Sequence, residues 1–127
     1  MTDSIDYYNK NASIFFHDTV NVEMTDLYAR FLKCIPKGGE ILDAGCGSGR
    51  DSKFFKEAGF RVSAFDASEE LAKLASAHAG INVAVKKLNE IEEFSIYDGI
   101  WACASLLHVK PEDMPDVLKR ILGALKP

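Results

Sequence analysis

The chain has 127 residues, of which 47% are hydrophobic and 27% are charged, and its formal net charge is −4. This length suits one domain with a single hydrophobic core over residues 1–127, and no second domain is expected. The acidic balance, with basic residues scattered among acids, argues against a nucleic-acid partner.

The first part of the chain, residues 1–37, is expected to be helical. Apolar positions over residues 5–16 suggest a short helix. An apolar stripe over residues 20–35 predicts a second helix, which Pro36 and the two glycines that follow should end.

Strand and helix patterns alternate over the rest of the chain. A strand is predicted at residues 40–44, and the helix after it, over residues 50–58, should stop at Gly59. The later elements expected are strands at residues 60–65, 81–85 and 97–103, a helix capped by Ser68 that runs to about Ala79, and a last helix with Pro115 in its first turn. This alternation predicts an α/β fold with a parallel sheet and right-handed crossovers.

The first predicted strand runs directly into a glycine-rich turn. Residues 40–52 read Glu-Ile-Leu-Asp-Ala-Gly-Cys-Gly-Ser-Gly-Arg-Asp-Ser, with Gly45, Gly47 and Gly49 spaced two apart. Without a Cβ, these residues allow positive φ and let a ligand approach the main chain. A dinucleotide turn, Gly-x-Gly-x-x-Gly, needs a small residue at position 50, where this chain has Arg50. A fragment of a nicotinamide enzyme is therefore a disfavoured alternative.

Three further stretches carry motifs of their own: residues 60–68, residues 97–109, which contain Ala-Ser-Leu-Leu-His-Val, and residues 122–127. With the turn, they make the chain resemble a class I S-adenosylmethionine-dependent methyltransferase, most of all the bacterial tellurite-resistance-type small-molecule branch. The resemblance implies a Rossmann-like sheet of strand order 3-2-1-4 and SN2 transfer of a methyl group to a small-molecule acceptor. It also implies an N-terminal helical cap (1–37) and an α/β core (38–127) that lacks the last strands of the fold.

The acidic residues near the turn are candidates for cofactor contacts. Asp66 lies near the roughly 20-residue offset at which a carboxylate reaches ribose hydroxyls, and this role is preferred to the alternative of a turn or cap residue. By resemblance, Asp43 orients the methionine amino group; the alternative is that it bonds loop amides. Arg50 could pair with the methionine carboxylate, or with Asp51 or Glu57 on its own helix.

The resemblance also gives roles to the ends of the third and fourth predicted strands. Asn89 could bond the adenine amino group or be a simple loop residue. The complete set of expected cofactor-binding residues is Asp43, Gly45, Cys46, Gly47, Gly49, Arg50, Asp66, Ala67, Leu88, Asn89, Cys103 and Ala104. His108 is the titratable group near the sulfonium channel that suits proton removal at neutral pH, so it is either a general base or a residue that holds its loop. Tyr7, Tyr8 and His17 lie in the segment that caps the cofactor, where packing explains the tyrosines equally well.

Other functions remain open at this point. The chain could be a noncatalytic S-adenosylmethionine-binding or interaction module, and its methyl acceptor cannot be read. The fourth strand should be an edge strand, which invites self-association. The three cysteines of the chain are far apart and lack a Cys-x-x-Cys pair, so neither a disulfide framework nor a metal site is predicted. Acidic residues near the N-terminus and the lack of ~18 consecutive apolar residues predict a cytoplasmic protein with no membrane partner.

Overall fold

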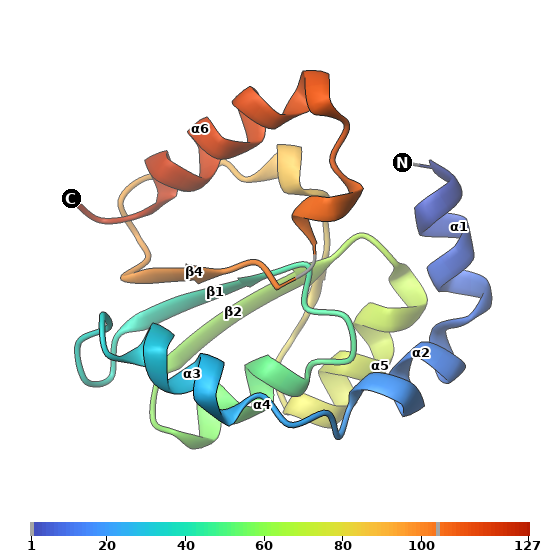
Figure 1. The fold of residues 1–127 in the computed structure, drawn as a ribbon, viewed down its shortest axis with the longest axis horizontal. Helices are drawn as coiled ribbons and strands as arrows, with labels where there is room; N and C mark the ends of the chain where they lie inside the picture. The colour runs from blue at the N-terminus through green and yellow to red at the C-terminus, as the bar shows by residue number, and fades with distance from the viewer. Residues whose placement is uncertain (1, 104) are drawn as a thin grey trace.

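The computed structural model describes residues 2–103 and 105–127. A parallel four-stranded sheet of order β3-β2-β1-β4 forms its centre, with helices on both faces (Figure 1). The strands are β1 (Glu40–Ala44), β2 (Arg61–Asp66), β3 (Ala84–Val85) and β4 (Gly99–Trp101). The helices are α1 (Thr2–Lys10), α2 (Ala12–Thr19), α3 (Thr25–Leu32), α4 (Arg50–Glu57), α5 (Glu69–Ala79) and α6 (Met114–Ala124), with 3₁₀ turns η1 (Leu88–Glu90), η2 (Leu106–His108) and η3 (Pro111–Asp113). The predicted α/β class and strand order are confirmed.

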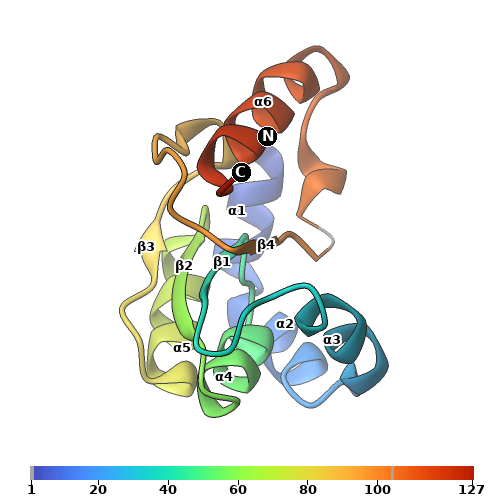
Figure 2. The ribbon, with the colours of Figure 1, turned by 90° about the vertical axis from the view of Figure 1, so that its left-hand side faces the viewer.

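Successive residues of the strands face different helices, as the twofold repeat of a strand requires. Leu42 and Ala44 contact the α6 side, where Ala124 is buried. Ile41 points to the opposite face and packs among Tyr28 of α3 and Phe55 of α4. Figure 2 shows these two layers, with α6 on one side of the sheet and α3, α4 and α5 on the other.

The N-terminal region differs from the prediction. Two helices, α1 and α2, stand where one was expected, and the helix predicted over residues 20–35 begins only at Thr25. The Glu23 carboxylate accepts the Thr25 N–H at 2.7 Å, which satisfies a free donor at the start of α3. The helix was predicted to begin too early because the apolar spacing runs on through residues 20–24. That spacing carries no information about the hydrogen bond that Glu23 makes at the start of α3.

Two strands are shorter than predicted, for local reasons. The N–H of Val83 bonds the Ser76 hydroxyl at 3.0 Å instead of a neighbouring strand, so β3 begins only at Ala84. Tyr97 pairs with Leu125, and the N–H of Lys126 reaches the Tyr97 carbonyl at 2.9 Å. The chain just after α6 therefore covers the start of the outer β4 edge.

The segments that lead into and out of α5 agree with the sequence prediction. The Ser68 hydroxyl accepts the Leu71 N–H at 3.2 Å, and Gly80 ends the helix with φ of 70°. Among the described residues, no helix is long and apolar enough to cross a lipid bilayer.

Candidate functional site

The glycine turn that follows β1 requires glycine for two reasons. Gly45, Gly47 and Gly49 have φ of 77°, 56° and 81°, in the left-handed region. A Cβ on Gly45 would lie 2.5 Å from the Cβ of Ser105, and one on Gly49 would lie 3.0 Å from Ala75 of α5. Gly49 therefore serves the packing of the turn against α5.

A cavity opens at the carboxyl ends of the strands. Its walls come from α1 and α2, the glycine turn, the end of β2, the segment after β3 and the segment after β4. The predicted site residues that line it are Gly45, Gly47, Asp66, Ala67, Leu88, Asn89, Cys103 and His108. Of the other predicted residues, Asp43, Cys46, Gly49 and Arg50 lie outside the cavity lining, and Ala104 lies outside the described residues.

Asp66 has a fixed carboxylate on the cavity wall. One oxygen accepts the Gly47 N–H at 2.8 Å, and the other accepts the Ser68 N–H at 2.9 Å. Burial raises the pKa of Asp66, and the two backbone hydrogen bonds act in the opposite direction. Each carboxylate oxygen can accept a further hydrogen bond, so the turn role and a ribose role are compatible.

Asn9 of α1 makes contacts with the start of α5 that were not predicted from the sequence. Its side-chain oxygen accepts the Ser68 hydroxyl at 2.6 Å and the Glu70 N–H at 3.3 Å. The N-terminal helix is thereby fixed to the start of α5, directly beside Asp66.

Tyr8 and His108 meet across the cavity. The Tyr8 hydroxyl lies 3.1 Å from Nε2 of His108, and their rings pack edge to face with centroids 5.5 Å apart. Burial, followed by the neighbouring Tyr7, raises the pKa of Tyr8. Both residues were sequence candidates, but residues 100 apart in the chain gave no sign of this contact. Tyr7 is 57% exposed and, like His17, lies outside the lining.

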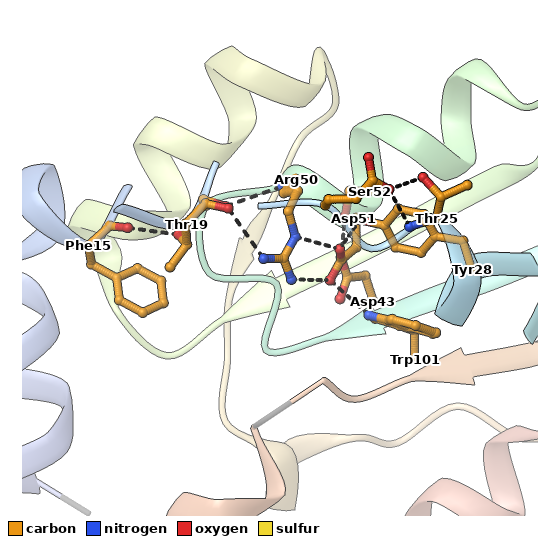
Figure 3. A network of polar contacts seen from close by, with 11 residues as sticks. Phe15, Thr19, Thr25, Tyr28, Asp43, Arg50, Asp51, Ser52 and Trp101 are labelled. Atoms are coloured by element: carbon orange, nitrogen blue, oxygen red, sulfur yellow. Dashed lines mark hydrogen bonds and ion pairs between the residues drawn. The ribbon is translucent and has the colours of Figure 1, made fainter. Parts of the chain in front are cut away.

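Arg50 pairs with Asp51 behind the glycine turn (Figure 3). Its Nε and Nη2 donate to the two Asp51 oxygens at 2.8 and 3.2 Å, and its Nη1 donates to the Thr19 carbonyl at 3.2 Å. Asp51, only 4% exposed, also accepts the Trp101 indole N–H at 2.8 Å and the Tyr28 hydroxyl. We call Tyr28, Arg50, Asp51 and Trp101 the Asp51 cluster. The predicted methionine carboxylate is not needed to satisfy Arg50 here.

Asp43 lies next to this cluster and is 1% exposed. The Ser52 hydroxyl donates to its carboxylate at 2.7 Å. Burial, with the negative charge of Asp51 as a smaller contribution, raises the pKa of Asp43 to about 7. Its partner is thus a side-chain hydroxyl, which neither sequence alternative had named.

The two cysteines of the predicted site have different surroundings. Cys46 is buried among small residues of α5, such as Ala72 and Ala75, and burial raises the pKa of its thiol. Cys103 lines the cavity, and partial burial also raises the pKa of its thiol. Both thiols are therefore protonated at neutral pH.

Known proteins identify the family of this fold and site. Residues 16–127 match the family model described as a methyltransferase domain. The chain belongs to this methyltransferase family. The class I S-adenosylmethionine-dependent methyltransferase predicted from the sequence is thereby confirmed.

Individual methyltransferases share both sequence and structure with the chain. It is 30% identical over 99 residues to a ubiquinone biosynthesis O-methyltransferase of Xanthomonas axonopodis pv. citri, and this match covers 72% of this chain and 41% of that protein. A Burkholderia thailandensis 1,6-didemethyltoxoflavin-N1-methyltransferase, solved with 1,6-didemethyltoxoflavin and S-adenosylhomocysteine, is 27% identical, with a TM-score of 0.75 over 99% of this chain and 56% of that one. The chain spans 40 to 42% of the length of the curated relatives it matches.

For the tellurite-resistance branch expected from the sequence, the comparisons give a likeness of fold. A TehB-like methyltransferase of Corynebacterium glutamicum is 23% identical, with a TM-score of 0.73 over 98% of this chain and 68% of that one. This likeness shows the fold alone, so the branch stays a prediction.

Proposed function

We propose that the cavity binds S-adenosylmethionine and that the chain is part of a methyltransferase that acts on a small-molecule nucleophile. The observation that carries the proposal is that Gly45, Gly47 and Asp66 line the same cavity as His108. The Burkholderia relative, solved with S-adenosylhomocysteine and a small heterocyclic substrate, supports both parts of it.

The residues present suit this cofactor. The glycine turn exposes main chain at the end of β1, and the fixed Asp66 carboxylate can accept hydrogen bonds from two ribose hydroxyls. Leu88 and Asn89 on the wall after β3 would contact the adenine ring, and Cys103 would lie toward the sulfonium. Residues 1–37 would act as the helical cap, since Tyr8 of α1 and Phe15 of α2 line the cavity.

When bound, the cofactor supplies an electrophilic methyl group, so the protein's task is chiefly to position the acceptor in line with it, within ~3.5 Å, and to exclude water. His108 is the proposed acceptor of the proton that the nucleophile loses. In the tautomer whose Nε2–H donates to the Tyr8 hydroxyl at 3.1 Å, this contact fixes the imidazole, and Nδ1 is the atom that would take the proton.

Replacing Asp66 with Ala is expected to weaken S-adenosylmethionine binding by roughly 1–3 kcal/mol, because charge-assisted hydrogen bonds to the ribose are lost. Isothermal titration with S-adenosylmethionine, S-adenosylhomocysteine and NAD measures this, and NAD should not bind. Asp66→Asn keeps one acceptor for the Gly47 N–H and should be milder. Asp116→Ala removes an exposed carboxylate on α6 and serves as the control. Unchanged affinity in Asp66→Ala would remove the ribose assignment.

Replacing His108 with Gln is expected to lower methyl transfer roughly 10²-fold while cofactor affinity stays the same. Tyr8→Phe should lower it less, because the imidazole remains. The measurement is S-adenosylhomocysteine release with a panel of phenols, amines and thiols. If His108→Gln turns over as fast as the wild type, His108 is a loop residue. If the wild type binds the cofactor but methylates no acceptor, the noncatalytic module is favoured.

Self-association through β4 is part of the proposal. Tyr97 directs its N–H and C=O toward residues 124–126, while Asp98 bonds Glu40 of β1. Since successive residues of a strand alternate in this respect, Gly99 and Trp101 direct theirs to the outer edge.

We expect the Gly99 and Trp101 amides to become protected from hydrogen exchange as protein concentration rises, in step with a larger mass by light scattering. The Ile100 amide, directed toward β1, is the internal control. A monomer at all concentrations would contradict pairing at this edge.

A further inference from the structure

Buried carboxylates outnumber cations behind the glycine turn. Asp43 and Asp51 are 1% and 4% exposed, and Arg50 is the cation of this region. Its guanidinium donates to Asp51 and to the Thr19 carbonyl. The hydrogen-bond partner of Asp43 within the described residues is the neutral Ser52 hydroxyl. Asp43 therefore lacks a dedicated counter-charge in this part of the chain.

The groups around Asp43 come from several elements. From α4, Asp51 favours its protonated form, and Arg50 and Ser52 favour its ionised form. From the end of β2, Asp66 favours the protonated form. The thiols of Cys46, in the turn, and Cys103, after β4, are neutral. Tyr28 of α3 and Trp101 of β4 donate to Asp51 rather than to Asp43.

Asp43 also lies within electrostatic range of the cavity. It lies at the end of β1 and precedes Gly45, a residue of the cavity lining, by two residues. A cation placed against this wall would supply the charge that Asp43 lacks, and a buried site screens such an attraction less than water does.

The two ligands of the proposed function differ in this respect. S-adenosylmethionine carries a sulfonium, an ammonium and a carboxylate, a net charge of plus one. S-adenosylhomocysteine has lost the sulfonium charge and is neutral overall. We propose that Asp43 is the buried counter-charge by which the cavity prefers the cationic methyl donor over its neutral product, and that donor binding displaces a proton from the Asp43 carboxyl to solvent. This inference rests on the proposed function of the cavity.

The test is isothermal titration of the whole chain with each ligand at pH 7, in two buffers of different ionisation enthalpy. The slope of the observed heat against buffer enthalpy gives the number of protons released. At pH 7 about half of the Asp43 carboxyls are protonated, so we expect release of up to about half a proton with the donor, less with the product, and none with Asp43→Asn. Asp116→Asn, an exposed carboxylate outside the cavity, should behave as the wild type.

Selectivity provides the second readout. The ratio of product to donor dissociation constants should fall about tenfold from pH 8 to pH 6 in the wild type and stay flat in Asp43→Asn. A purely structural role of Asp43 would change both affinities together and leave the proton count alone. If Asp43→Asn does not fold, Ser52→Ala answers the same question, because loss of this donor should move proton release to higher pH.

Two results would overturn the inference while leaving the proposed function intact. One is proton release with the donor that persists in Asp43→Asn; the other is selectivity whose pH dependence vanishes in His108→Gln, which would assign the proton to His108. Absence of binding by either ligand would instead refute the proposed function, and with it this inference.

Discussion

Replacing Asp51 with Ala is expected to lower the free energy of unfolding by roughly 3–5 kcal/mol, the cost of removing one partner of a buried ion pair. The substitution leaves the Arg50 guanidinium without its carboxylate and the Tyr28 hydroxyl and Trp101 indole N–H without their acceptor. Each of these groups is at least partly withdrawn from water, so its lost hydrogen bond is not fully replaced by solvent.

Urea unfolding followed by Trp101 fluorescence measures this effect, since the indole donates directly to Asp51 and is the chain's one tryptophan. The matched control is Asp116→Ala, which breaks an exposed ion pair with Arg120 at 2.9 Å and should cost at most about 1 kcal/mol. Equal losses in the two variants would mean that the Asp51 cluster is no more stabilising than a surface pair.

Replacing Asp43 with Asn is expected to change the pH dependence of stability. The free energy of unfolding of the variant, relative to that of the wild type, should be higher at pH 8 than at pH 4. Burial raises the pKa of Asp43 to about 7 in the folded state, against about 3.9 in an unfolded chain. Between about pH 3.9 and pH 7, Asp43 is therefore protonated in the folded state and ionised in the unfolded state. The stability contributed by the protonated carboxyl is complete below pH 4 and is lost as pH rises through 7.

The size of this effect follows from the difference of about three pH units, which corresponds to an upper bound of about 4 kcal/mol. Asn is isosteric and keeps an oxygen for the Ser52 hydroxyl, so the substitution changes the titration with little change in packing. Denaturant unfolding at pH 4, 5.5, 7 and 8 gives the curve for each variant. Parallel curves for the wild type and Asp43→Asn would show that Asp43 ionises normally, and Asp116→Asn reports the contribution of a surface carboxylate.

The segment from β1 to α5 could be predicted closely because its signals are local. Three glycines mark the turn, Ser68 caps α5 and Gly80 ends it, and each signal acts within a few residues of the element it bounds. The N-terminal helices could not be placed as well, because the cap of α3 is a Glu23 side chain and the break at Asn11 interrupts no apolar stripe.

The types of residue at the site could be predicted from the sequence, but which of their side chains face the cavity could be predicted less well. Asp43 and Arg50 were expected to contact the cofactor, and the structure places both outside the cavity lining. Asp43 shares the strand face of Ile41, which points toward α3 and α4, and Arg50 is within reach of Asp51. The pairs Tyr8–His108 and Asn9–Ser68 depend on how α1 lies over the sheet, which no local pattern specifies.

Phe15 has a consequence for the rate at which the cavity exchanges its contents. Its ring lies so close to Gly47 that a Cβ there would be 3.1 Å from Cε1, so an apolar side chain of α2 already occupies the approach to the glycine turn. The same helical pair is fixed to the rest of the fold through Tyr8 and Asn9. A ligand that contacts the main chain at Gly47 would therefore lie against this ring. Exchange of a ligand at the turn would then depend on how readily the N-terminal helices move away from it.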